Sequence, residues 1–577
     1  MRKIIAIGVF IAASMLAVTP VAGQERVRPG AAESKPVAVA LDRASATATG
    51  GTSDAAFGPD ASAGASSSSV APPAAVDAQT YAREKAEAAR GPAPTGATRL
   101  AVPEARSGSA DPSASAAPSV PLNFAGLNRQ TAVNNGFVFN PPDTIVGKSP
   151  NRVLEGANSA LRLFNTSGGV IATSDMNTFF GASTTNGRLY DPKVYYDRNA
   201  TNPRFFVVGL QAAGKGDTNA ANDVSRIWVA VARSSDPANL SSSNWCRYNI
   251  EGRRNVGTSD VSWADYPQIG AGRDSFSFAV NNFRFTNSTF TYAVIHVWNK
   301  TIATNNASSC PSIPQYTFQP SSTIANFTAF TIQPAQSYTS PSSFSGTTNP
   351  AYYMSTTRGS SNQYHVYRIR NVASASPTLT SVTLTGHSYI IPPASPQPSS
   401  SIVIDTGDNR MLQVAGIGNT LVGMFTTGCN FSSPPNESCS LAPRVTVGQN
   451  GSGGLTATLV ENTFAGFGDN IFVHHQSIAT NTSLQSASTW EYSGSANHLR
   501  STAMFKNVNA AWSGVSTYAA GTCSLPATAP SATMARSGDY SGAQLDPALT
   551  SFWLAGEEAI TIGGSCQWQT RIARLIP

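Results

Sequence analysis

The residues of this chain that most readily suggest chemistry are aspartates that recur at the start of strand-like runs. Three stretches share an Asp, a Tyr or Pro, a polar turn and an aromatic run: YDPKVYYDRNATNPRFFVVG, ADYPQIGAGRDSFSFAVNN and RSGDYSGAQLDPALTSFWLAGE. With weaker relatives, the recurring aspartates are Asp143, Asp191, Asp265, Asp408, Asp469 and Asp539. If these positions are structurally equivalent, their carboxylates share one rim of the fold, where like charges need an offsetting partner.

Two kinds of partner would offset such a ring. Ca²⁺ takes several oxygen ligands at once and is the metal we expect if the ring holds one; no other cofactor is indicated. Basic side chains are the alternative, namely Lys193, Arg273 and Arg536. The expected ligand-binding residues are Asp143, Asp191, Lys193, Asp265, Tyr266, Arg536, Asp539 and Tyr540. The competing interpretation is structural, because an Asp before a strand commonly caps a turn.

Histidines are the first candidates for acid–base chemistry. In FVHHQS, strand alternation predicts that His474 and His475 point to opposite faces, so at most one of them faces the rim. His474 is the candidate general base if an Arg or Tyr lies opposite. His365 in QYHVYRIR has the same potential, with Tyr367 nearby. The alternative is that each histidine is a packed or surface residue.

Carboxylates offer a second catalytic arrangement. Glu557 and Glu558 are adjacent and should point to opposite faces, which leaves Glu557 with Asp539 as a pair for glycoside hydrolysis. The catalytic candidates are therefore His474, Asp539 and Glu557. No G-x-S-x-G, P-loop or H-E-x-x-H motif occurs in the sequence. The eight tryptophans could stack sugars, but most are expected in the core.

The elements that must position these residues are strands. Aromatic and β-branched runs follow one another from Leu122, separated by Gly, Asn, Pro and Ser, and none has a helical period. Residues 122–577 are predicted to be all-β, and the repeat favours a β-propeller of six or seven blades of roughly 65–75 residues. A β-helix and a pair of β-sandwiches are the rival folds. In a propeller, the innermost strands would bring the aspartates to one mouth of a central channel.

The N-terminal part has a different character. Residues 1–23 have a basic start, an apolar run and small residues before a cleavage site after Gly23, as in a secretory signal peptide. The apolar run is too short for a membrane span, so a soluble exported protein is expected. Residues 24–121 are rich in Ala, Ser, Pro and Gly and are predicted to be a disordered linker. Residues 77–90, DAQTYAREKAEAAR, are predicted to form a transient helix within it.

Cysteines and charge agree with export. All six cysteines lie beyond the signal peptide, and an even count predicts disulfides. Pairing in sequence order would join Cys246 to Cys310, Cys429 to Cys439 and Cys523 to Cys566. The formal net charge of +6 is small for 577 residues, and no basic run interleaves with aromatics, so nucleic acid is not an expected partner.

Five motifs carry a family resemblance. They are, in order, NPPDTIVGKSPNRVLEGANSALRLFN, YDPKVYYDRNATNPRFFVVGLQ, WADYPQIGAGRDSFSFAVNNF, RSGDYSGAQLDP with FWLAGE, and QWQTRIARL. Together they resemble a family of secreted bacterial β-propellers that is distantly similar to the sialidase-like superfamily. The resemblance implies a propeller in an extracellular or periplasmic location, but no activity. The S-x-D-x-G-x-T-W boxes of sialidases do not occur in the sequence, so their catalytic residues are not carried over.

The expected function is therefore binding or scaffolding by a secreted, monomeric propeller, with a polysaccharide or a surface protein as partner and without a membrane span. The alternative is a polysaccharide-active enzyme, a glycoside hydrolase or a lyase, with its site at the mouth of the channel. Convergence of Asp191, Asp265, Asp539, a His and an Arg or Tyr at one mouth would favour the enzyme.

Overall fold

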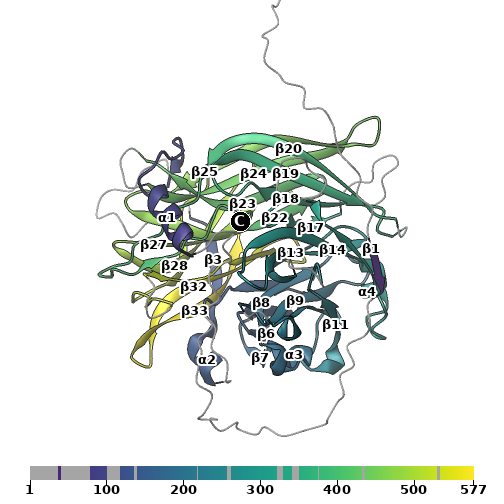
Figure 1. The fold of residues 1–577 in the computed structure, drawn as a ribbon. Coiled ribbons are helices and arrows are strands. Elements are labelled where there is room, and N and C mark those ends of the chain that lie inside the picture. The colour runs from purple at the N-terminus through teal and green to yellow at the C-terminus, as the bar shows by residue number, and fades with distance from the viewer. Residues whose placement is uncertain are drawn as a thin grey trace, which may run out of the picture. The chain divides into compact units, whose positions relative to one another are not determined.

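The computed structural model of this 577-residue chain describes residues 37–40, 78–100, 117–134, 140–216, 219–256, 261–320, 329–340, 350–373, 376–431, 436–528 and 533–577. The regular secondary structure of the described part is mostly β-strand, in a β-propeller arrangement (Figure 1). The predictions of an all-β class and of a propeller are both confirmed.

Five blades are separate four-stranded antiparallel sheets. Their strands are β4 (Ile145–Lys148), β5 (Arg152–Ala157), β6 (Ala160–Asn165) and β7 (Val170–Asp175); β8 (Leu189–Asp197), β9 (Arg204–Ala213), β10 (Val224–Ala232) and β11 (Trp245–Glu251); β16 (Gln333–Pro334), β18 (Ala351–Thr356), β19 (Ser361–Arg370) and β20 (Thr378–Tyr389); β26 (Ile471–Thr480), β27 (Ser486–Gly494), β28 (Asn497–Lys506) and β29 (Ser516–Ala520); and β31 (Gly542–Leu545), β32 (Phe552–Ile562) and β33 (Ser565–Ile576) with β3 (Ser119–Asn128).

Two further four-stranded meanders belong to one eleven-stranded sheet. They are β12 (Ser262–Ala271), β13 (Ser275–Arg284), β14 (Phe290–Asn299) and β15 (Pro314–Phe318), and β22 (Gln413–Ile417), β23 (Thr420–Cys429), β24 (Glu437–Gln449) and β25 (Leu455–Gly466). The short β17 (Gln336–Thr339) pairs in parallel with both β12 and β22 and so merges them. Free-standing blades therefore number five, compared with the six or seven expected. At the edges lie β1 (Val37–Ala40) and β2 (Thr98–Arg99), while β21 (Val403–Ile404) pairs separately with β30 (Met534–Ala535).

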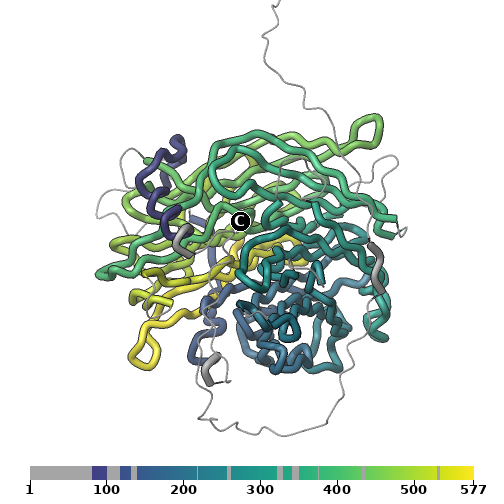
Figure 2. The backbone as a smooth tube through the Cα atoms, viewed as in Figure 1, coloured from purple at the N-terminus to yellow at the C-terminus, as the bar shows by residue number. Residues whose placement is uncertain are grey.

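The first strands of the sheets surround a common hub. Strands β4, β8, β12, β22, β26 and β31 lie next to one another in this order, with β16 and β17 between β12 and β22, and β31 lies next to β4. The ring is closed from both ends of the propeller, because the early strand β3 pairs with the last strand, β33. Figure 2 shows this closure as the yellow C-terminal strands beside the blue β3 segment.

The faces between blades form the core. Strands β8 and β12 are buried along their whole length, as expected for strands packed on both faces. All eight tryptophans are buried, which confirms the expectation that they are core residues: Trp228, Trp245, Trp263, Trp298, Trp490, Trp512, Trp553 and Trp568. Among the described residues, no helix is long and apolar enough to cross a membrane.

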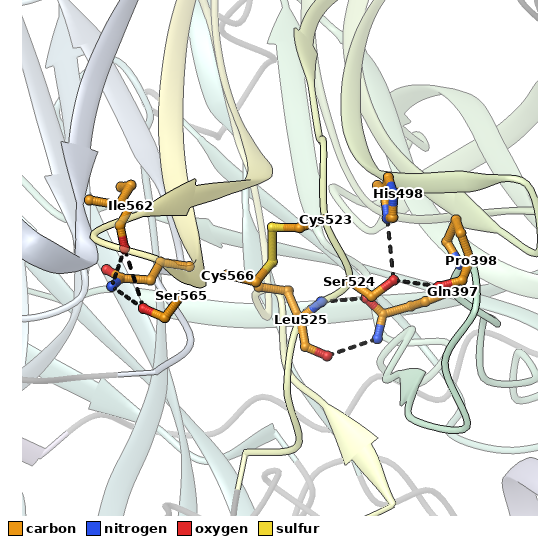
Figure 3. The surroundings of a disulfide bond; sticks show 10 residues. Gln397, Pro398, His498, Cys523, Ser524, Leu525, Ile562, Ser565 and Cys566 are labelled. Carbon is orange, nitrogen blue, oxygen red and sulfur yellow. Dashed lines mark hydrogen bonds between the residues drawn. A yellow bond between two sulfur atoms is a disulfide. The ribbon is translucent and has the colours of Figure 1, made fainter.

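Three disulfides cross-link the propeller, and their pairing is the predicted one. Cys246 bonds to Cys310, Cys429 to Cys439 and Cys523 to Cys566. The last of these joins the segment after β29 to the β32–β33 hairpin (Figure 3). Beside it, Ser524 donates to the carbonyl of Pro398, and Gln397 exchanges hydrogen bonds with Leu525. Three disulfides are typical of an oxidising compartment.

Helices are few and short: α1 (Ala78–Ala88), α2 (Arg129–Asn134), α3 (Met176–Phe180), α4 (Lys300–Asn305) and single 3-10 turns at Thr184–Asn186, Ala220–Asn222 and Ser242–Asn244. The predicted signal peptide, residues 1–23, lies outside the described residues, as do residues 24–36, 41–77 and 101–116 of the predicted linker. Residues 78–100 differ from the expectation of a disordered linker, because α1 packs on the propeller and β2 pairs with β25.

Candidate active site at the propeller mouth

The recurring motif proves to be a strained bulge near the start of an inner strand. Strands β8, β12 and β26 each contain one extra residue, so that two residues lie opposite one on the neighbouring strand. The first residue of each bulge has a left-handed backbone: Asp191 (φ 51°), Tyr266 (φ 52°) and His475 (φ 47°). Asp143, just before β4, has φ 48°. Pro192 and Pro267 are the second bulge residues, where no ladder hydrogen bond is required. Such conformations are costly outside glycine and concentrate at functional sites.

These bulges bring three aspartates together. The backbone N–H of Asp539 donates to Oδ1 of Asp143 at 2.6 Å, and Asn158 bridges Asp143 and the N–H of Asp191 through its amide group. Burial raises the pKa of Asp143 well above its ordinary value, and the charges of Asp539 and Asp191 raise it further. Burial likewise raises the pKa of Asp191, helped by Asp265 and Asp539. Carboxyl groups in this state can carry a proton near neutral pH.

Asp265 belongs to the same cluster. Burial is the main cause that raises its pKa to about 6, although Lys215 opposes the shift. Asp143, Asp191, Asp265 and Asp539 therefore influence one another's charge within one buried cluster.

Basic groups offset the carboxylates. Arg536 forms an ion pair with Asp539, and the Lys193 ammonium lies 2.8 Å from the ring centre of Tyr540. Burial lowers the pKa of Lys193 well below its ordinary value. A Ca²⁺ site built from carboxylates alone does not fit this arrangement, because Arg536 already supplies a counter-charge to Asp539.

Both tyrosines of the cluster are held as hydrogen-bond donors. The Tyr266 hydroxyl donates to the carbonyl of Asp539 at 3.0 Å, and the Tyr540 hydroxyl donates to the carbonyl of Pro192 at 3.0 Å. Burial raises the pKa of each well above its ordinary value. Neither phenol is therefore suited to act as a base.

Arg410 is a further member of the cluster. Its guanidinium forms a bidentate pair with Asp408 at 2.6 and 2.7 Å and lies 4.3 Å from the ring centre of Tyr266. Burial acts to raise the pKa of Asp408, but Arg410 and Arg358 outweigh it, so that this pKa is lowered. Asp408 is thus ionised, in contrast to Asp143 and Asp191.

The histidine prediction was wrong in its geometry. His474 and His475 do not point to opposite faces, because the bulge in β26 turns both toward Glu491 on β27: their Nδ1 atoms are 3.2 Å apart. Burial lowers the pKa of each well below its ordinary value, so both rings are neutral. Glu557 and Glu558 do diverge, with Glu557 accepting from the N–H of Thr144 and Glu558 paired with Arg571.

Several candidates lie elsewhere. Asp469 is 64% exposed and pairs with Arg99, so it is not part of the cluster. Arg273 is exposed and lines a separate pocket with Asp274 and Lys300. His365 is bonded to Thr357 and Thr383, each at 3.0 Å.

A helix from the predicted linker covers the mouth. The hydroxyl of Tyr81 on α1 donates to Oδ1 of Asp405 at 2.8 Å, and the ammonium of Lys85 donates to Oγ1 of Thr406 at 2.7 Å and to the carbonyl of Gly407. Glu84 pairs with Arg358 at 2.7 Å. The cavity beneath α1 has a volume of about 10 Å³, which is room for about one water. A glycan does not fit the site in this state.

Tyr81, Lys85, Arg410 and Glu491 were missed as site residues. Tyr81, Lys85 and Ala88 are buried on one face of α1 at a helical spacing, so an amphipathic pattern was present in the sequence. Arg410 follows Asp408 by two residues, a spacing that predicts nothing by itself. Glu491 is recognisable only through its cross-strand pairing with His474.

The fold and the site together define a β-propeller with a buried cluster of acidic and basic residues near the starts of its inner strands. No known protein-family profile matches the chain, and no curated protein matches it.

Solved structures similar to the chain include an alpha-L-arabinanase from Penicillium chrysogenum complexed with arabinobiose (7% identity, TM-score 0.35, covering 79% of this chain and 98% of that one). Others are an alpha-L-arabinofuranosidase from Fusarium graminearum with an iminosugar inhibitor (8%, 0.33, 80% and 98%) and a polysaccharide lyase (9%, 0.28, 84% and 97%). At these identities and TM-scores, the activities of these proteins are not transferred to this chain.

Proposed function

We propose that the protein is a glycan-active hydrolase whose site is the carboxylate cluster at the propeller mouth. The observation that carries the proposal is a buried cluster of carboxyl groups whose pKa values are shifted in opposite directions. Asp143 and Asp191 have raised pKa values, Asp539 is paired with Arg536, and Asp408 has a lowered pKa. Carboxyl groups driven apart in this way are the usual basis of acid–base assignments in hydrolases.

Asp191 is the proposed general acid and Asp539 the proposed general base. Asp143 already accepts hydrogen bonds from Asp539 and Asn158, which leaves Asp191 as the freer of the two proton donors. In the reaction, Asp191 gives its proton to the glycosidic oxygen as the bond from that oxygen to the anomeric carbon breaks. A water adds its oxygen to the anomeric carbon and passes a proton to Asp539. The sum is hydrolysis, with one proton taken up and one released.

Lyase chemistry is less well supported, since both hydroxyls of the cluster are engaged as donors and neither Tyr266 nor Tyr540 is available as a base. A sugar-binding module is also less well supported than the sequence suggested, because every tryptophan is buried and none forms a stacking platform.

Three further features belong to the proposal. The meanders β12–β15 and β22–β25 act as blades of their own, giving seven around the hub. The chain is exported by its signal peptide, and it acts outside the cytoplasm as a monomer. Because α1 covers the site, substrate enters only after α1 has moved.

The test compares Asp191→Asn with Asp469→Asn in the full chain, each combined with Lys85→Met to loosen α1. Both aspartates have a left-handed backbone, φ 51° and φ 57°, which Asn tolerates, so the two variants are matched in backbone conformation. Purified proteins are incubated with neutral and uronate-containing polysaccharides, and reducing ends are measured. Loss of a general acid should lower the rate by about 10²- to 10⁴-fold for Asp191→Asn, with no change for Asp469→Asn.

Three results would contradict the proposal. Equal rates for the two variants would remove Asp191 from the reaction. Products that absorb as unsaturated sugars would show a lyase. Retention on immobilised glycan without release of reducing ends would show a binding module.

A further inference from the structure

The two histidines and the glutamate of the fourth free-standing blade form a group that the proposed hydrolysis does not use. His474 and Glu491 face each other across β26 and β27, and the bulge brings His475 to the same side. All three side chains are buried, with relative exposures of 0%, 0% and 1% for His474, Glu491 and His475. Three donor atoms of metal-binding type therefore meet in the interior.

Their spacing is poor for hydrogen bonds. Nδ1 of His475 lies 3.4 Å from Oε2 of Glu491, and Nδ1 of His474 lies 3.8 Å from the same oxygen. Hydrogen bonds from nitrogen to oxygen are usually about 2.7–3.2 Å long. The two Nδ1 atoms are 3.2 Å apart, and a hydrogen bond between them would use the only proton on one ring.

The same spacing fits a tetrahedral zinc ion. With ligands at about 2.0–2.2 Å, neighbouring ligand atoms of a tetrahedral zinc site are about 3.3–3.6 Å apart. The three measured separations, 3.2, 3.4 and 3.8 Å, are close to the edges of one face of that tetrahedron. Two imidazoles and one carboxylate are a common protein ligand set for zinc, with the fourth position left to water.

The surroundings support metal binding at the Nδ1 atoms. Nε2 of His474 lies 3.5 Å from Oγ of Ser493, which is longer than a normal hydrogen bond, and Nδ1 is the nitrogen of this ring that faces Glu491. Oε1 of Glu491 is buried without a hydrogen-bond partner. Such an orphaned polar atom is expensive unless a further ligand satisfies the carboxylate.

We propose that His474, His475 and Glu491 bind a zinc ion through Nδ1, Nδ1 and a carboxylate oxygen, with one exchangeable position. The site goes beyond the proposed hydrolase and does not depend on it. It also accounts for the left-handed backbone of His475, because the bulge is what lets two consecutive residues reach one ion.

The experiment measures the metal content of the purified full-length protein after dialysis against zinc chloride and then against metal-free buffer. One zinc per chain is expected, and cobalt chloride should give the visible absorption of a tetrahedral site. Glu491→Gln and His474→Gln should each weaken zinc binding by at least about 100-fold. Matched controls are Glu155→Gln and His365→Gln, which alter a buried glutamate and a buried strand histidine elsewhere and should retain zinc.

Wild-type protein that retains no zinc would overturn the assignment, as would zinc retention by both Glu491→Gln and His474→Gln. If either variant fails to fold, the deciding measurement is the removal of zinc from the wild-type protein with a chelator. Zinc removal should lower its melting temperature and re-addition restore it, and an unchanged melting temperature in wild type would also count against the site. None of these results depends on hydrolysis.

Discussion

Replacing Lys85 by methionine tests whether α1 is held on the propeller mouth by a buried charge. The Lys85 side chain is 3% exposed, donates to Thr406 and Gly407, and lies 3.4 Å from Asp405, which is itself 4% exposed. Methionine keeps the length and helix preference of the side chain but leaves Asp405 without its cation. Removing one partner of a buried ion pair costs about 3–5 kcal/mol.

The substitution destabilises the docked state only, because Asp405 is hydrated again when α1 undocks from the propeller. At 1.4 kcal/mol for each factor of ten, the population of undocked α1 should rise by about 10²- to 10³-fold. Hydrogen exchange of the amides of residues 78–88 measures this directly, since undocked helix of this length exchanges rapidly. The polysaccharide assay should show activity rising in parallel.

Arg83→Met is the matched control on the same helix. Arg83 and its partner Glu87 are 65% and 70% exposed, and pairs of this kind contribute about 0.3–0.5 kcal/mol. Exchange should therefore change by about twofold at most. If Lys85→Met leaves the exchange of α1 unchanged, or if Arg83→Met has an equal effect, the buried pair does not hold the helix.

Two further predictions concern stability. The pKa of Asp265 is raised from 3.8 to about 6, so between these pH values the folded state binds more protons than the unfolded state. The free energy of unfolding should therefore fall by about 3 kcal/mol as pH rises through this window. In urea unfolding, the Asp265→Asn variant should lack this pH dependence. A rise in stability between pH 4 and 6 attributable to Asp265 would contradict this. Replacing both cysteines of one disulfide by serine should lower the free energy of unfolding, because the bond restricts the unfolded chain. The expected loss is about 4 kcal/mol for the pairs separated by 64 and 43 residues and about 3 kcal/mol for the pair separated by 10. Denaturant unfolding measures these losses, and an inverted order would refute the loop-entropy reasoning.

The propeller class could be predicted from the sequence because it depends on local patterns, and the disulfides follow the order of the cysteines along the chain. Strand-length aromatic runs with turn residues between them specify strands, and the repeat of one motif specifies repeated sheets. The merging of two meanders by β17 could not be foreseen, since Gln336–Thr339 is four residues long and pairs in parallel with distant strands. Parallel pairing depends on the whole arrangement and leaves no local signal.

The candidate site was predicted in part. Asp191 and Asp265 lie at bulges of inner strands, and Asp539 joins them just before β31, where its N–H donates to Asp143. His475 could not be placed, because the alternation rule fails where a bulge adds residues to a strand. Lys85 was assigned to a linker on composition, although Tyr81, Lys85 and Ala88 share one face of the helix; the surface that receives this face cannot be identified from the sequence.

The bulges explain how a β-propeller concentrates charge at its hub. A regular strand presents every second residue to one face, so each inner strand would offer single, separated side chains to the mouth. A bulge with a left-handed residue breaks that alternation at a cost of about 1–3 kcal/mol for each such residue. Asp143, Asp191, Tyr266 and His475 all have this conformation, and none is glycine. Their side chains lie at the buried cluster. Glycine at these positions would relieve the backbone strain, but it would also remove the side chains on which the proposed chemistry depends.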